Sequence, residues 1–104
     1  MHTSPCKMNT TFKVGRSAEE NWKLILAADK EYYWLHAGGA KPSSHIIIEI
    51  DSEPTPNELA HAAQLCNAQT KSSYKHFVYA QIKDVRLGSK PGQVTLKKSQ
   101  EFHL

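Results

Sequence analysis

The spacing of apolar positions divides the chain into two helical segments and several extended ones. Over residues 18–28, Trp22 and Ile25 recur at the spacing that places them on one face of a helix. Just before this segment, Ser17 and Glu20 can exchange hydrogen bonds with each other's backbone amides, as in a capping box. The pattern predicts a helix over 18–28, with Trp22 as a core anchor because large aromatic side chains dominate core burial.

A second helix is predicted to begin at residue 56 and to fade near residues 70–73. Thr55 can cap its first turn, Pro56 fits the first helical position, and Glu58 completes a capping box. Its apolar face consists mostly of small side chains, so the helix can lie close against a sheet. The residues of that face are Leu59, Ala62, Ala63 and Cys66.

The remaining apolar stretches alternate or run continuously, as β-strands do. The strongest is residues 45–50, where three consecutive isoleucines predict burial on both faces and a central place in the sheet. The order β-α-β-β-α-β-β-β predicts an α+β fold, a mixed β-sheet with two packed helices, in a single domain. The other expected strands cover residues 12–14, 32–37, 76–85, 93–97 and 101–104, with a hairpin turn at residues 98–100.

Residues 1–11 are polar and without a period, so we expect a flexible N-terminal arm before one domain over residues 12–104. No apolar run approaches the roughly 20 residues needed to span a bilayer, and the N-terminus lacks the apolar core of a signal peptide. Cys6 and Cys66 belong to no C-x-x-C pair, which disfavours a paired-thiol zinc or redox site. We therefore expect a cytoplasmic or nuclear protein with reduced thiols and no membrane partner.

His36 and His45 end and begin consecutive predicted strands, so they can meet at one rim of the sheet if those strands pair. They could ligate zinc, for which Asp29, Glu31 and His76 are candidate further ligands. They could act in acid–base catalysis, although no nucleophile or carboxylate dyad accompanies them. They could instead contact phosphates or bases in a binding site, or only satisfy local backbone groups.

The formal net charge of +3 is a mild bias toward anionic partners. Arg16 stands just before the first predicted helix, where free amides and a guanidinium favour an anion. Lys83, Arg86 and Lys90 form a basic cluster near the C-terminus, interleaved with aromatic residues. Such a cluster can neutralise phosphates and stack unpaired bases, although a solvated sheet face with inward aromatics fits the same pattern. The aromatic residues are Tyr74, Phe77 and Tyr79.

Four stretches together carry a resemblance to a known family. They are residues 14–21, with Gly-Arg and a later asparagine; residues 33–37, with Trp-x-His; residues 42–48, with Ser-His before a β run; and residues 85–94, with Lys-Pro-Gly. They follow the family's order over almost everything after Thr11, and the chain resembles the NFACT-R domain family in a stand-alone, single-domain version. It departs from the family pattern at Trp22 and Tyr32, where acidic residues are frequent, and at Ser43, where glycine is frequent.

The resemblance implies a non-catalytic module without a cofactor that binds structured RNA such as tRNA or ribosomal RNA; one relative is associated with DNA. Larger relatives also carry fibronectin-binding-like and coiled-coil segments and engage the large ribosomal subunit in ribosome-associated quality control. A small histidine- or metal-dependent nucleic-acid hydrolase, and a protein-interaction or DNA-binding module, are the alternatives. Trp34 would support the site from the core. The expected nucleic-acid-binding residues are Arg16, Asn21, His36, Ser44, His45, Lys83, Arg86 and Lys90.

Overall fold

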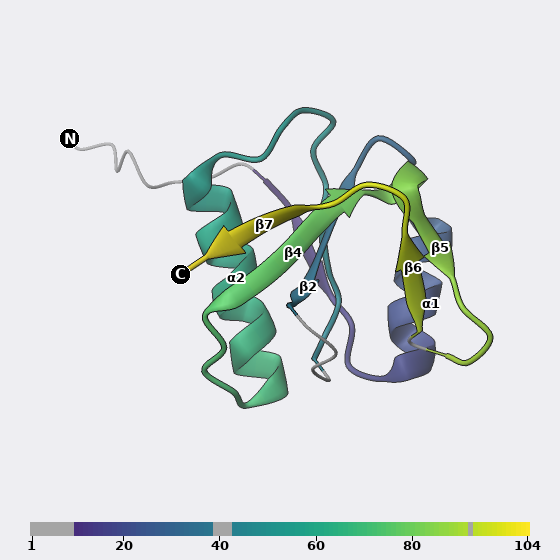
Figure 1. Ribbon diagram of the computed structural model, residues 1–104, viewed down its shortest axis with the longest axis horizontal. Coiled ribbons are helices and arrows are strands. Elements are labelled where there is room, and N and C mark those ends of the chain that lie inside the picture. Colours follow the sequence, from purple (N-terminus) through teal and green to yellow (C-terminus); the bar gives the residue numbers. More distant parts are fainter. Residues whose placement is uncertain (1–9, 39–42, 92) are drawn as a thin grey trace.

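The computed structural model describes residues 10–38, 43–91 and 93–104 (Figure 1). Of the expected flexible N-terminal arm, residues 1–9 lie outside the described residues. The last two residues of that arm are bonded to the domain. The Thr10 hydroxyl donates to the Glu58 carboxylate, and the Thr11 carbonyl accepts from the Glu49 amide at 2.9 Å.

The described residues form two helices, a short 3-10 helix and seven strands. Ser17 caps the first helix, and Thr55 forms the complete capping box of the second with Glu58, so both predicted helix starts are confirmed. No helix in the described part of the chain is long and apolar enough to cross a membrane. The elements in order are β1 (Phe12–Val14), α1 (Ala18–Ala27), β2 (Tyr33–Ala37), β3 (Ile46–Ile48), α2 (Pro56–Thr70), β4 (His76–Gln81), η1 (Ile82–Asp84), β5 (Val85–Leu87), β6 (Val94–Leu96) and β7 (Gln100–His103).

Five strands form one sheet in the order β1-β3-β2-β4-β7, and β5 pairs with β6 in a separate two-stranded sheet. Strands that are distant in sequence are neighbours in the sheet, such as β1 and β3 or β4 and β7. Every pairing among the described strands is antiparallel. β3 lies inside the larger sheet, and its three isoleucines are buried on both faces, as the isoleucine run predicts. The α+β class, with two helices packed on a sheet in a single domain, is confirmed.

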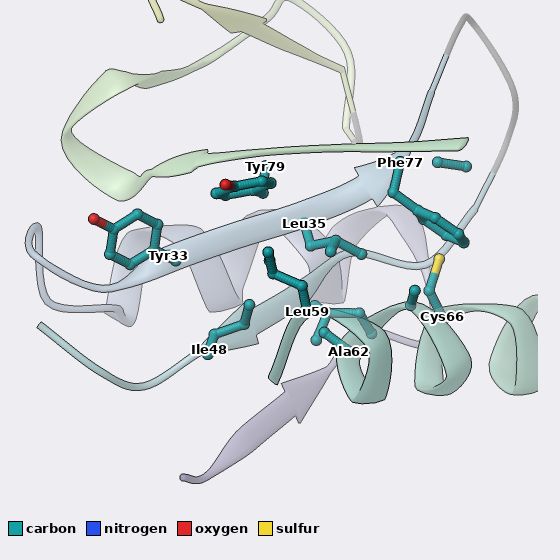
Figure 2. Packing of buried hydrophobic residues seen from close by; sticks show 11 residues of the cluster. Tyr33, Leu35, Ile48, Leu59, Ala62, Cys66, Phe77 and Tyr79 are labelled. Atoms are coloured by element: carbon teal, nitrogen blue, oxygen red, sulfur yellow. The ribbon is translucent and has the colours of Figure 1, made fainter. Parts of the chain in front are cut away.

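One face of the five-stranded sheet packs against α2. Leu35 of β2 and Phe77 of β4 are fully buried there, and Figure 2 shows Cys66 of α2 beside the Phe77 ring. Small side chains such as Ala62 let the helix lie close to the strands. Tyr79 belongs to the same cluster, and its hydroxyl donates to the Glu53 carboxylate at 2.9 Å. The predicted apolar face of α2 is therefore the face that is buried.

The other face is partly covered by α1 and the β5–β6 pair, on the opposite side of the sheet from α2 (Figure 1). Trp34 of β2 packs there with Ile25 of α1 and Val85 of β5. Trp22, expected as a core anchor, is only half-buried, and its indole N–H donates to the Gln93 carbonyl at 3.0 Å. Trp34 rather than Trp22 therefore anchors this second core.

The C-terminal strands differ from the prediction. The expected strand over residues 76–85 ends at Gln81, where the Ile82 amide donates to the Tyr32 carbonyl at 2.8 Å and the chain turns out of the sheet. The expected hairpin turn at residues 98–100 is wrong, because β6 pairs with β5 whereas β7 pairs with β4. This segment carries the chain from one sheet to the other. Strand periodicity describes one strand at a time and does not identify its partner.

Candidate functional site

A cleft of about 1090 Å³ opens on the sheet face that α1 and the β5–β6 pair leave uncovered. Its walls come from the start of α1, the facing ends of β2 and β3, the end of α2 and the segment leading into β6. Residues far apart in the sequence therefore meet around one space. Of the expected nucleic-acid-binding residues, six line this cleft: Arg16, Asn21, His36, Ser44, His45 and Lys90.

The two imidazoles meet because β2 and β3 pair antiparallel, with Leu35 opposite Ile46, so that the next positions outward are His36 and His45. Their ring centroids lie 4.8 Å apart with the rings nearly perpendicular. Trp34 stacks on His36 at 5.5 Å and meets the edge of His45 at 5.2 Å. The three rings form one aromatic wall of the cleft, and the predicted meeting of His36 and His45 through strand pairing is confirmed.

Both imidazoles are uncharged at neutral pH. Burial lowers the pKa of His36, against a smaller opposite effect of a hydrogen bond with the Ala37 backbone. Burial, followed by repulsion from His36, lowers the pKa of His45 to about 3. A neutral imidazole offers one hydrogen-bond donor and one acceptor rather than a positive charge. These side chains are therefore suited to uncharged polar groups and not to charge neutralisation of phosphates.

The same aromatic wall holds unpaired polar atoms. Within the described residues, Trp34 Nε1 and His45 Nδ1 are the buried side-chain nitrogen or oxygen atoms that have no hydrogen-bond partner. Leaving one such atom unsatisfied costs about 1–3 kcal/mol. Native proteins keep few of these atoms, and those they keep call for an explanation such as an ordered water, an ion or a functional role.

Asn21, in the wall of the cleft, holds the backbone at His45 in place; we call this contact with Gly15 and His45 the Gly15–Asn21 brace. Its side-chain oxygen accepts from the His45 amide at 3.3 Å, and the Gly15 amide donates to the His45 carbonyl at 2.9 Å. A Cβ atom on Gly15 would lie 1.8 Å from that Asn21 oxygen, so only glycine leaves room for it. Asn21 is 7 % exposed. The Gly-Arg and asparagine motif therefore orients His45, and Asn21 is a positioning residue.

Ser44 has a similar bracing role on the other side of His45. Its amide donates to the Thr70 hydroxyl at 2.9 Å, and its carbonyl accepts from the Cys66 thiol at 3.3 Å. The Ser43 hydroxyl accepts from the Ala37 amide at 3.1 Å. These bonds tie the chain before β3 to the end of α2 and to β2. Ser44 is buried, and it shapes the wall of the cleft from behind.

Among the described residues, three exposed cations line the cleft: Arg16, Lys71 and Lys90. None of the described lining residues is Asp or Glu. Lys71, which belongs to no motif of the sequence, follows the last residue of α2 in the left-handed conformation with φ 58°. The sequence indicates where α2 ends and that a residue caps this end. It does not indicate that the capping residue lines a cleft formed with other elements.

The expected anion site at the start of α1 is only partly available. The Ser17 hydroxyl accepts from the Glu20 amide, as the predicted capping box requires. The Glu20 carboxylate, however, accepts from the Arg16 amide at 2.7 Å and not from the predicted Ser17 amide. The Arg16 amide, just before the N-cap, is therefore already used by a carboxylate of the chain, and the Glu20 amide of the first turn by the Ser17 hydroxyl. The Arg16 guanidinium, rather than the helix terminus, is the group left for an anion.

The residues of the expected basic cluster, Lys83, Arg86 and Lys90, do not line one common site. Lys83 lines a second pocket of about 590 Å³, together with Lys98 and the acidic residues Glu53 and Asp84, and Arg86 lines neither pocket. The expected base-stacking aromatics also separate. Phe77 and Tyr79 are buried against α2 and cannot stack on an unpaired base, whereas Tyr74 lines the cleft.

The predicted zinc ligands do not gather around His36 and His45. In the ranges that the structure describes, one group of three close metal-ligating side chains is found, and it comprises His76, Glu101 and His103. Asp29 and Glu31 belong to no such group among those residues. The candidate further ligands named from the sequence thus leave the histidine pair of the cleft without a third ligand.

Comparisons with known proteins support the fold. The structure is similar to the C-terminal part of the fibronectin/fibrinogen-binding protein from Streptococcus suis, with a TM-score of 0.80 and 25 % sequence identity. The match covers 92 % of this chain and 41 % of that one, so this chain spans about two-fifths of the length of the solved chain. The name of that protein refers to fibronectin and fibrinogen and not to RNA. Neither a scan against protein-family models nor a search of curated proteins found a match.

Proposed function

We propose that this domain is a non-catalytic RNA-binding module and that the cleft is its RNA site. The observation that carries the proposal is the charge of the cleft, whose described lining holds three cations and no carboxylate. Phosphate contacts supply most of the affinity of nucleic-acid-binding proteins. A cleft with this charge favours a polyanion over a cationic or zwitterionic ligand.

The groups on the cleft wall suit single-stranded or looped nucleotides. Sequence-specific recognition of RNA mostly targets unpaired bases, which aromatic rings stack and polar groups hydrogen-bond. Neutral His36 is half-buried and can bond base edges or ribose hydroxyls, and the fully buried His45 packs against it. Arg16, Lys71 and Lys90 contact phosphates. Loops of tRNA and ribosomal RNA offer such nucleotides, in agreement with the RNA classes that the NFACT-R resemblance implies.

The chemistry of the cleft favours binding over hydrolysis. With a pKa of about 3, His45 is not in the imidazolium form that acts as a general acid at neutral pH. No acidic side chain in the described lining can orient either imidazole or hold a catalytic metal ion. A nuclease assay on the unaltered chain with added Mg²⁺ and Zn²⁺ tests the hydrolase alternative, which predicts turnover that His36→Ala abolishes.

Filter binding to tRNA over a salt series tests RNA binding. With three phosphate contacts, the slope of log affinity against log salt is about −2.1 to −2.7, which is an affinity loss of about 20- to 40-fold between 50 and 200 mM salt. Removing one contact by Arg16→Ala or Lys90→Ala flattens the slope by about 0.7 to 0.9. The matched controls Arg86→Ala and Lys83→Ala lie outside the cleft and leave the slope unchanged.

Two results would remove the RNA proposal. One is the absence of binding by folded protein at low salt. The other is a slope that changes as much in the control variants as in the cleft variants. Competition with single-stranded and duplex DNA in the same assay decides whether DNA also binds. Sedimentation with ribosomal subunits tests the large subunit as a partner, and fractionation of cells tests the expected cytoplasmic location.

A second candidate function is protein binding, which the structural similarity to part of a fibronectin/fibrinogen-binding protein favours. It predicts capture of this chain on immobilised fibronectin or fibrinogen, with no effect of RNase. Under the RNA proposal, capture on these proteins is absent, and any association with ribosomes is lost after RNase treatment.

A further inference from the structure

Three metal-ligating side chains meet at the C-terminal edge of the sheet, outside the cleft described above. β4 and β7 pair antiparallel with His76 directly opposite His103. Glu101, two residues before His103, lies on the same face of β7 because side chains alternate along a strand. The His76 and His103 rings stack with centroids 4.6 Å apart, and His76 Nε2 lies 3.0 Å from Glu101 Oε1. The ligand atoms of all three residues lie within 4.8 Å of one another.

The backbone holds His76 in place for this arrangement. A Cβ atom on Gly38 would lie 2.3 Å from His76 Nδ1 and 2.6 Å from His76 Cε1. The imidazole therefore occupies space that only glycine leaves free. The Gly38 amide also donates to the His76 carbonyl at 2.9 Å, which fixes the strand beneath the ring. With one ring edge against Gly38, His76 presents Nε2 to Glu101.

We propose that His76, Glu101 and His103 form a zinc site that joins the edge strand β7 to β4. Two imidazoles and one carboxylate are a ligand set that zinc accepts, with bonds of about 2.0–2.2 Å and a fourth position for water or another group. Ligand atoms around a tetrahedral ion with such bonds lie about 3.3–3.5 Å apart. The His76–Glu101 pair is already near that separation.

The widest separation, 4.8 Å, must close by about 1.5 Å to reach the tetrahedral distance. His103 can supply this movement because it is exposed and is the last residue of the edge strand. Glu101 is also exposed, with 65 % of its side chain accessible. The half-buried His76 thus provides the fixed ligand, and the two β7 residues close around the ion.

Isothermal titration of ZnCl₂ into the full chain tests the site. We expect one zinc ion per chain, and a rise in the melting temperature, because binding to the folded state alone stabilises it. His103→Ala and Glu101→Gln each weaken binding by at least ~10-fold, because loss of even an indirect partner of a ligand costs that much. Glu101→Gln retains a hydrogen-bond acceptor for His76 and removes the anionic ligand, so it separates metal binding from the simple His–Glu contact.

His61→Gln is the matched control. His61 lies on α2 against the Phe12 ring, away from β7, and its replacement leaves the zinc affinity unchanged. Circular dichroism of each variant establishes that it is folded. The proposal is overturned by folded protein that binds no zinc, or by zinc affinity that is equal in the unaltered chain, His103→Ala and Glu101→Gln. Neither result depends on whether the chain binds RNA.

Discussion

Replacing Gly15 by alanine tests whether the Gly15–Asn21 brace holds the cleft together. The added Cβ would lie 1.8 Å from Asn21 Oδ1 and 2.9 Å from Asn21 Cγ, so the Asn21 amide must move. Such a movement breaks the bond from the His45 amide, which is 3.3 Å long in the intact structure. The substitution therefore combines overpacking with the loss of a buried hydrogen bond.

The magnitude follows from these two effects. Overpacking typically costs about 1–3 kcal/mol, and a buried amide left without its acceptor costs about 1–3 kcal/mol. Gly15→Ala should lower the free energy of unfolding by about 2–6 kcal/mol, a large part of the roughly 5–15 kcal/mol that stabilises an ordinary domain. Urea denaturation followed by far-UV circular dichroism measures this change.

A double-mutant cycle identifies the cause. Asn21→Ala removes the clashing amide as well as the bond to His45, so Gly15→Ala should cost much less in the Asn21→Ala background than in the unaltered chain. The tight 3.2 Å approach to Asn21 Cα remains in both backgrounds. A Gly15→Ala loss below about 1 kcal/mol, or additive losses in the double variant, would refute the bracing role.

Three further predictions concern single residues. His45 has a pKa near 3 in the folded protein and about 6.5 when unfolded, so the unfolded state binds the extra proton as the pH falls below 6.5, and the free energy of unfolding drops by about 2 kcal/mol between pH 8 and pH 5. In urea denaturation at both pH values, His45→Gln should lack this part of the loss. An unchanged pH dependence in that variant would contradict the lowered pKa. Thr55→Ala removes the N-cap of α2 and should lower the free energy of unfolding by about 1 kcal/mol in the same assay, whereas a neutral effect would mean that the cap contributes nothing. Burial raises the pKa of the Cys66 thiol, which donates to the Ser44 carbonyl, so in a Cys6→Ser background a thiol reagent at neutral pH should react only as the chain unfolds, and rapid reaction under native conditions would disprove this burial.

Local sequence determined the helices and the burial of the central strand. The caps at Ser17 and Thr55 depend on residues within four positions, so the helix starts can be read directly from the chain. Three consecutive isoleucines leave no polar side chain for either face of β3, and burial on both faces follows. His36 and His45 stand at facing strand ends, so a single pairing brings them together.

Only the tertiary structure decided which charged side chains share a site. Lys90 lines the cleft while Lys83, seven positions earlier, does not, because the chain leaves the main sheet after Gln81 and the β5–β6 pair crosses to α1. His76 and His103 are neighbours only through the pairing of β4 with the last strand. Such contacts depend on which distant strands pair, and this choice is made by the burial of whole faces rather than by the residues beside each position.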